Sequence, residues 1–324
     1  MILKRLLPVL LVALCAAPEA SPVFADDGFL PPNNLSIPID SLESKGITHQ
    51  QFNQVLDHIQ ALYGPIIASR GGRLVINRLW DDATVNASAQ RGGADGTDYV
   101  LNMYGGLARH AAITQDGFAL VACHELGHHI GGAPKYSNGL DWASNEGQAD
   151  YFANLKCLRL VFADTASNAF TRASLDDSQP QAACAKSFAG ARERAICVRT
   201  AVAGMSVTAL LRALRSEPVA PRYDTPDPNV VTRMYDRHPP TQCRLDTYFS
   251  ASLCTRAVGD ELSETDPVPG ACTGSQGFSV GLRPRCWYKP PADEPAPRSM
   301  AGAFGLPKTD IATSLSRHDL WKGL

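Results

Sequence analysis

The amino-acid sequence predicts an α+β fold that is mainly helical, with a small β-sheet edge and a disulfide-rich C-terminal extension. Apolar residues recur at helical spacing over several segments, whereas strand-like patterns are confined to residues 71–107. The chain carries nine cysteines, and its last part, from about residue 257, is rich in Gly, Pro and Cys. Its length of 324 residues is sufficient to bury a sizeable core.

The N-terminus is typical of a secretory signal peptide. Lys4 and Arg5 precede the apolar run "LLPVLLVALCAA", and small residues follow at "SPVFA". This pattern predicts cleavage after Ala25, so residues 1–25 would be removed and the mature chain would be periplasmic or secreted. An uncleaved membrane anchor is the alternative. A lipoprotein site at Cys15 is disfavoured because the residue before it is larger than the small residue expected there.

The overall charge gives no indication of a charged partner. A formal net charge of −2 argues against bulk attraction to nucleic acid or to an acidic membrane. After the signal, we expect no segment that is long and apolar enough to span a bilayer. Any partner must therefore be inferred from a site and not from the overall charge. That site would belong to a domain over residues 26–256, followed by the extension at residues 257–324.

The first half of the mature chain predicts one helix and three strands. The helix covers residues 48–63, where Thr48 provides a cap and apolar residues repeat every three or four positions. A strand is expected within residues 71–82, after a Gly-Gly turn. Two short strands are expected within residues 84–107, joined by a Gly-rich turn at residues 92–96.

Three further helices are expected in the second half. One runs from Gln115 to Ile130 and ends at "GGAP", a Gly-then-Pro stop signal. The next covers about residues 144–162. Residues 165–182 are polar and are expected to form a loop. A helix over about residues 185–215 then ends at a Pro-rich loop.

Eight cysteines remain once the signal is removed. An even number in an exported chain indicates disulfides and an oxidising compartment. Sequence spacing suggests three local pairs and leaves a fourth: Cys184–Cys197, Cys243–Cys254, Cys272–Cys286 and, by remainder, Cys123–Cys157. Free or metal-bound thiols are the alternative, although no CxxC pair supports a structural zinc site.

The stretch "FALVACHELGHHIGGAP", residues 118–134, places three histidines and a glutamate on an otherwise apolar helix. His124, Glu125 and His128 form an HExxH motif, which presents two imidazoles to one ion from one helix face. Zinc suits this set and lowers the pKa of its water toward about 7. Glu125 would then be the general base. The alternative is a helix whose histidines are only packed or hydrogen-bonded.

A third metal ligand is expected from the following helix. The HExxHxxGxxH layout fails because Pro134 stands where its third histidine would be. "ASNEGQADYFA" instead supplies Glu146 as a ligand. Asp150, four residues further on, would accept a hydrogen bond from a ligand histidine and fix its tautomer. Two solvated carboxylates are the alternative. If the two helices pack side by side, a bridge from Cys123 to Cys157 would brace the site.

These residues, in this order, resemble the HtpX-type and CAAX prenyl protease family of zinc metalloendopeptidases, a gluzincin group. Similar stretches are "TVNASA", "VLNMYGGL", "NEGQADYFA" and the late "RHPPTQCRLDTY", and together they span about residues 74–249. The resemblance implies a zincin-like metalloprotease domain with one Zn²⁺ per chain. Zinc would be bound by His124, His128 and Glu146, and Glu125 would be the catalytic base.

The resemblance also implies roles for residues outside these two helices. His238 would reach the site from a loop and stabilise the developing oxyanion. Arg244 would pair with a carboxylate near the site, such as Asp150. Asn86 and Ala87 would lie on an edge strand that aligns a peptide substrate by strand addition.

Family members commonly carry transmembrane helices around the catalytic domain, so this chain resembles a soluble, exported branch. We therefore expect a metalloendopeptidase that hydrolyses exported proteins through a zinc-activated water, in a role such as periplasmic quality control. Prenylated peptides are not expected as substrates. The alternative is a non-catalytic zinc-binding scaffold of the cell envelope. A third hypothesis is latency, in which residues 26–46 or the tail cover the cleft.

Overall fold

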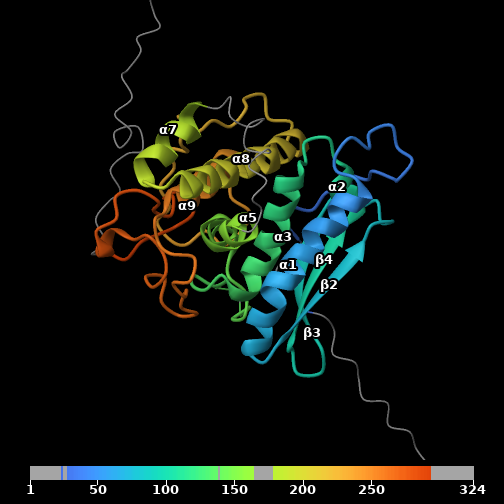
Figure 1. Ribbon diagram of the computed structural model, residues 1–324, viewed down its shortest axis with the longest axis horizontal. Helices are drawn as coiled ribbons and strands as arrows, with labels where there is room; N and C mark the ends of the chain where they lie inside the picture. Colours follow the sequence, from blue (N-terminus) through green and yellow to red (C-terminus); the bar gives the residue numbers. More distant parts are fainter. Residues whose placement is uncertain (1–22, 25–27, 138, 164–177, 293–324) are drawn as a thin grey trace, which may run out of the picture.

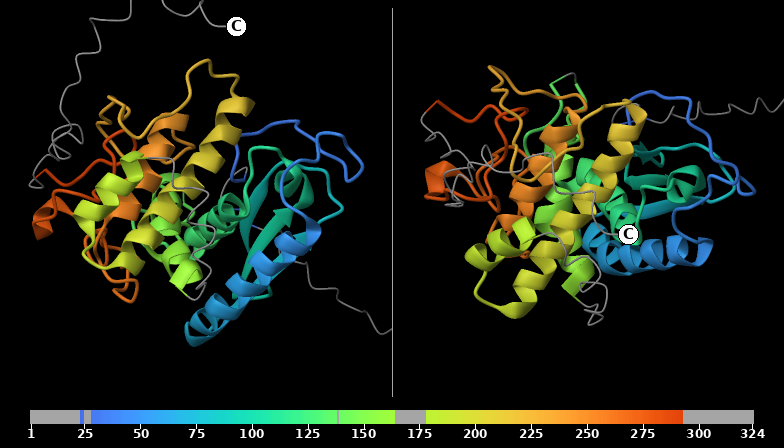
Figure 2. Two further views of the ribbon diagram at one scale, coloured as in Figure 1. Left: turned by 45° about the horizontal axis from the view of Figure 1, so that its top comes forward. Right: turned by 90° about the horizontal axis from the view of Figure 1, so that it is seen from above.

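The computed structural model describes residues 23–24, 28–137, 139–163 and 178–292. The fold is α+β and mostly helical, as expected (Figure 1). The small sheet and helix α1 (His49–Ser69) lie on one side of helix α3 (Gln115–Ile130). Helices α8 (Ala191–Leu214) and α9 (Thr241–Leu253) lie on its other side (Figure 2). The helix that carries HExxH is therefore the centre of the molecule.

Within the described residues, the sheet is mixed and has four strands, of which the three longer ones were expected. β2 (Arg73–Leu79) pairs in parallel with β4 (Asp98–Tyr104), and β3 (Ala87–Gly92) pairs antiparallel with the other side of β4. The two-residue strand β1 (Val23–Phe24) adds antiparallel to β3. In the turn between β3 and β4, Gly93 has a φ of 77°, a left-handed conformation that favours glycine. The rest of the expected signal peptide lies outside the described residues.

Helix α1 begins one residue after Thr48, whose side chain accepts a hydrogen bond from the backbone N–H of Gln51 in a capping box. Its buried face packs against β2 and α3. That face consists of Phe52, Val55, Leu56, Ile59, Tyr63 and Ile67. The helix continues past the expected end at residue 63 to Ser69, because Ile67 extends the buried apolar stripe by one more turn.

Helix α3 has the bounds that the sequence predicts. The Thr114 side chain accepts a hydrogen bond from Gly117 N at 3.0 Å and so caps the first turn. Every residue from Asp116 to Ile130 is buried. A Cβ added at Gly127 would lie 3.0 Å from the Cα of Ala149, so the missing side chain allows the next helix to approach closely.

The helix expected over residues 144–162 is divided into three consecutive segments. Helix α4 (Glu146–Phe152) is capped by Asn145, whose side chain accepts a hydrogen bond from Gln148 N. A π-helical segment (Ala153–Cys157) and helix α5 (Leu158–Ala163) follow without a break. α4 packs against α3, which places the two candidate ligand segments side by side.

The expected helix over residues 185–215 is wrong in its extent, because two helices occupy this region. α7 (Ser178–Ser187) ends before Gly190, the residue that precedes α8. α7 also begins inside the segment that was expected to be a loop, and residues 164–177 of that segment lie outside the described part. α9 was not expected at all. The described residues also contain two short helical elements, α2 (Gly105–Arg109) and a 3-10 turn at Gly274–Gln276.

The expectation that no segment after the signal is long and apolar enough to cross a membrane is wrong for α8. This helix has the required length and composition. However, 56% of its most apolar window is buried inside the protein, where it packs against α3 and α9. Core helices pass the same test, so the length and composition of α8 are weak support for a membrane span.

Four disulfides are present, and two of the expected pairs are among them. Cys123–Cys157 joins α3 to the π-helical segment, and Cys184–Cys197 joins α7 to α8. The other two expected pairs are wrong. Cys243 pairs with Cys286, and Cys254 pairs with Cys272.

The reason for this correction is the unexpected helix α9. Cys243 lies in its first turn and Cys254 directly follows its last residue. At 1.5 Å per residue these positions are roughly 16 Å apart, too far for a disulfide. Each of these cysteines instead bonds to the segment after residue 257, so both ends of α9 are fastened to the extension.

Asp246 of α9 is expected to make stability depend on pH. Its carboxyl accepts hydrogen bonds from Asp227 N and Gln242 Nε2, at 2.7 and 2.8 Å. Burial nevertheless raises the pKa of Asp246 from 3.8 to about 7. Between about pH 4 and pH 7 the folded state holds the proton more tightly than the unfolded state. The free energy of unfolding should therefore fall as pH rises, by on the order of 2–4 kcal/mol from this group.

The measurement is urea denaturation of the wild type and Asp246→Asn at pH 4.5 and pH 8. The stability advantage of the wild type over Asp246→Asn should shrink toward pH 8. Asp266→Asn is the matched control, because Asp266 is exposed and accepts a backbone hydrogen bond from Val268 N at 2.9 Å. A difference between wild type and Asp246→Asn that stays the same at both pH values would contradict the prediction.

Candidate functional site

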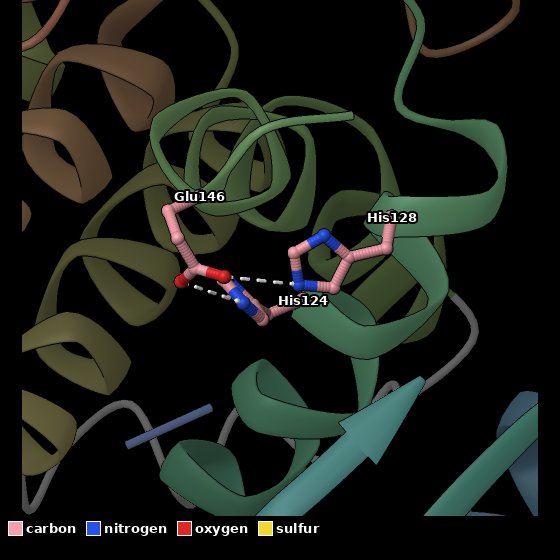
Figure 3. A group of neighbouring side chains, drawn as sticks. All are labelled: His124, His128 and Glu146. Atoms are coloured by element: carbon pink, nitrogen blue, oxygen red, sulfur yellow. Dashed lines mark ion pairs between the residues drawn. The ribbon is translucent and has the colours of Figure 1, made fainter. Parts of the chain in front are cut away.

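Three buried side chains, His124, His128 and Glu146, converge between α3 and α4 (Figure 3). His124 Nε2 lies 3.4 Å from Glu146 Oε2, and His128 Nε2 lies 3.4 Å from Glu146 Oε1. One candidate ligand atom from each residue lies within 4.8 Å of the others. The three side chains therefore form a group that could hold a metal ion.

Hydrogen bonds at the other ring nitrogens orient both histidines. His124 Nδ1 donates to Asp150 Oδ1 at 2.7 Å, and His128 Nδ1 donates to the carbonyl oxygen of Ser144 at 2.8 Å. With the proton on Nδ1, the lone pair of each neutral ring is on Nε2. Both lone pairs then face Glu146, the arrangement that metal-binding histidines need.

Asp150 is the centre of a buried hydrogen-bond network. Arg244 donates to Asp150 from Nε at 2.8 Å and from Nη2 at 2.7 Å, and the Tyr248 hydroxyl donates to Oδ1 at 2.7 Å. All three side chains are fully buried. The bidentate guanidinium contact fixes the plane of the carboxylate that holds the His124 ring.

The charges at the site favour a cation. Burial by itself raises the pKa of Glu146, but His238 and His124 lower it well below its usual range. Burial likewise raises the pKa of Asp150, but Arg244 and His124 together lower it below its usual value. Burial lowers the pKa of His124, but Glu146 and Asp150 raise it above its usual value. Arg244 neutralises Asp150, so the charge of Glu146 is directed to the two imidazoles.

The two residues expected to take part in catalysis lie beside this group. Glu125 is fully buried on α3, between the two histidines in sequence. His238 comes from the loop before α9, and its Nε2 lies 3.6 Å from Glu146 Oε2. The same Nε2 donates to the carbonyl oxygen of Gly28 at 2.7 Å. The structure thus brings His238 to the site from a position distant in sequence.

Asn86 and Ala87 were expected to align a peptide substrate from an edge strand. Ala87 is the first residue of β3 and Asn86 directly precedes it. The expectation of an edge strand is wrong, because β1 pairs with the outer side of β3. Asn86 and Ala87 both contact the chain's own N-terminal segment. Phe29 N donates to the Ala87 carbonyl oxygen at 2.9 Å, and Leu30 N donates to Asn86 Oδ1 at 2.9 Å. Their hydrogen-bonding groups therefore already hold the segment Gly28–Leu30.

Sequence reasoning missed two tyrosines of the site. The Tyr136 hydroxyl donates to Glu146 Oε1 at 2.9 Å from the loop between α3 and α4. Tyr248, on α9, donates to Asp150. Tyr136 lies in a loop without periodicity, and Tyr248 belongs to a helix that was not expected. Tyr136 had no sequence signal, and the only signal for Tyr248 is that it follows Arg244 by four residues.

His129 does not belong to the metal group. Its ring stacks between Tyr99 and Trp142, with centroids 5.0 Å from each. Its Nε2 donates to the Val100 carbonyl oxygen at 3.2 Å. Burial lowers the pKa of His129 well below its usual value, so the ring is neutral and serves packing between α3 and the sheet.

Tyr136→Phe is expected to weaken zinc binding by about tenfold, because the Glu146 carboxylate loses the donor that orients it. Competition with a chelator of known affinity measures this. Tyr223→Phe is the matched control, since its buried hydroxyl donates to the Ala201 carbonyl oxygen at 3.0 Å, within a different cluster of the core. Equal zinc affinities for the two variants would mean that Tyr136 does not position Glu146.

The residues present fit a zinc ion. Within the described part of the chain, His124 Nε2 and Glu146 Oε2 are buried and have no hydrogen-bond partner. Buried polar atoms in that state are costly unless they bind an ion. Two imidazole nitrogens and one carboxylate oxygen are a zinc donor set that leaves a fourth position open. A second group contains Cys243 and Cys286, but both are in a disulfide and are not ligands.

Comparison of the chain with protein-family models, with curated proteins and with solved structures gives no match. The class of protein must therefore be defined from the site itself. The site defines a disulfide-bonded α+β protein with a buried His, His, Glu group that could hold a metal ion.

Proposed function

We propose that this chain is a zinc metalloendopeptidase, similar to the HtpX-type and CAAX prenyl protease family, that acts on exported proteins. One observation carries the proposal. Two imidazoles from one helix and a carboxylate from the next converge, and Glu125 follows the first imidazole in the chain. Four disulfides support an oxidising compartment outside the cytosol.

Each residue then has a defined task in peptide hydrolysis. His124, His128 and Glu146 would hold zinc, which polarises a carbonyl and makes water a stronger nucleophile. Glu125 would take the proton of the attacking water and pass it to the leaving amine. His238 would donate a hydrogen bond to the developing oxyanion, as it donates to a peptide carbonyl in the structure.

Other residues hold the proposed zinc ligands in position. Asp150, Arg244 and Tyr248 hold the His124 ring in position, and Tyr136 holds the Glu146 carboxylate. Asn86 and Ala87 would align the substrate backbone beside β3. A scaffold that only stored zinc would not need a buried carboxylate at Glu125. It would also not need His238 as a hydrogen-bond donor to a carbonyl oxygen.

The proposal is tested by elemental analysis and proteolysis on the same purified sample. We expect one zinc ion per exported chain and cleavage of unfolded casein between pH 6 and 8. A chelator should stop the cleavage, and added zinc should restore it. One bound zinc without any cleavage would instead favour a zinc-binding scaffold. No stoichiometric metal would contradict both functions.

A further inference from the structure

The N-terminal segment Gly28–Leu30 lies along β3 and beside the candidate zinc site. Phe29 N donates to the Ala87 carbonyl oxygen, and Leu30 N donates to Asn86 Oδ1, both at 2.9 Å. The Asn86 side-chain amide returns a longer hydrogen bond to the Leu30 carbonyl oxygen, at 3.4 Å. The first of these contacts is the backbone hydrogen bond that a peptide added beside β3 would make, and the other two come from the Asn86 side chain.

Two side chains of the site, His238 and Arg244, donate hydrogen bonds to backbone carbonyl oxygens of the same segment. His238 Nε2 donates to Gly28 O at 2.7 Å, and Arg244 Nη1 donates to Phe29 O at 2.9 Å. His238 also approaches Glu146 Oε2 at 3.6 Å. The Gly28 carbonyl thus meets the donor that the proposed function assigns to the oxyanion.

The Phe29 side chain fills a fully buried position beside the metal group. Its ring meets the His124 ring edge-on, with centroids 4.9 Å apart. The Arg244 guanidinium lies 4.3 Å from the Phe29 ring centroid. Phe29 and Leu30 are each 0% exposed. Burial of the large apolar Phe29 ring therefore adds binding free energy to that of the few backbone hydrogen bonds of the segment.

We propose that Gly28–Leu30 occupies the substrate cleft in the register of a substrate, with the Gly28–Phe29 peptide bond in the reacting position. This inference rests on the proposed function. It assigns the substrate class: segments with glycine directly before the bond to be cleaved and a large apolar residue directly after it, because a Cβ at the first position would lie 2.5 Å from the Ala87 carbonyl oxygen. The chain also inhibits itself, because an external peptide must displace this segment.

The register defines which bond of an external peptide reacts. Water oxygen would bond to the carbonyl carbon of the glycine that takes the place of Gly28. The bond from that carbon to the nitrogen of the next residue would break, and that nitrogen would leave as an amine after receiving a proton. The products are a carboxylate and an amino terminus that carries the large apolar side chain.

A substitution at Gly28 would displace the segment without replacing any residue of the zinc site. Its φ of 111° favours glycine, and a Cβ added there would lie 2.5 Å from the Ala87 carbonyl oxygen. Gly28→Ala should therefore separate the segment from β3. Gly71→Ala is the matched control, because Gly71 also has a positive φ, of 78°, and no atom lies within 4 Å of its added Cβ.

The experiment measures peptide binding without turnover. Zinc-loaded chains carrying Glu125→Gln and either Gly28→Ala or Gly71→Ala are titrated with a fluorescent peptide of sequence FADDGFLPPN, which copies residues 24–33. Gly28→Ala should bind at least about tenfold tighter than the control, because the competing segment has a high effective concentration. A peptide with Ala at the position of Phe29 should bind about tenfold or more weakly.

Equal binding by the two glycine variants, with one zinc and cooperative melting in each, would overturn the proposal. If Gly28→Ala does not fold, hydrogen exchange on the single variant Glu125→Gln decides. The Phe29 and Leu30 amides, bonded to β3 in the structure, should lose protection when the peptide saturates the protein. Unchanged protection would overturn the proposal.

Casein cleavage by the chain with Glu125 intact separates the two claims. Cleavage together with equal peptide binding means that only the cleft assignment fails. Tighter binding by Gly28→Ala without any cleavage means that the cleft is correct and that hydrolysis is not the function.

Discussion

Glu125→Gln is expected to lower kcat/KM for casein cleavage by about 10²–10⁴-fold while zinc remains bound at one ion per chain. The neutral amide has nearly the same shape as the carboxylate, but it cannot accept the proton of the attacking water. Glu125 is not among the three residues whose ligand atoms converge, so metal content should not change. Proteolysis assays and elemental analysis of the same preparation measure the two quantities.

Glu146→Gln is the matched comparison, because it makes the same chemical change at a residue of the metal group. This variant should lose zinc as well as activity. If Glu125→Gln kept wild-type activity in a sample free of other proteases, Glu125 would not be the base. If it lost zinc as Glu146→Gln does, Glu125 would be a ligand.

Arg244→Leu is expected to lower the free energy of unfolding by about 3–5 kcal/mol. The substitution leaves the Asp150 carboxylate in the core without its fully buried partner, and an uncompensated buried charge is costly. It also removes the hydrogen bond from Arg244 to the Phe29 carbonyl oxygen. Urea denaturation at saturating zinc measures the change.

Arg73→Leu is the control for this second prediction. Arg73 binds Asp98 with the same two-point geometry, at 2.9 and 2.7 Å, but its side chain is 73% exposed. Water replaces the lost contact there, so the expected cost is about 0–1 kcal/mol. Similar losses for the two arginines would show that burial of the Asp150 pair does not govern its energy.

Features set by neighbouring residues could be predicted from the sequence. The bounds of α3 follow from a cap at Thr114 and the stop signal after Ile130. His124, His128 and Glu146 could be chosen because four-residue spacing on a helix is a local pattern. The bridge from Cys123 to Cys157 followed by remainder once the other cysteines were paired.

Features that depend on contacts distant in sequence could not be predicted. α9 begins directly after Pro240, and its few apolar residues gave no clear period, so the disulfides at its two ends were assigned wrongly. The break before Gly190 allows Cys184 and Cys197 to meet across two helices. Tyr136 reaches Glu146 only because the loop between α3 and α4 folds back.

The bridge between Cys123 and Cys157 affects how the protein would acquire and lose its ion. Cys123 precedes His124 on α3, and Cys157 ends the π-helical segment that follows α4. A covalent bond therefore joins α3 to the helical segment that continues α4, and it does so whether or not an ion is bound. Zinc finger domains unfold when emptied, whereas this protein should empty and refill reversibly, exchanging one divalent cation for another.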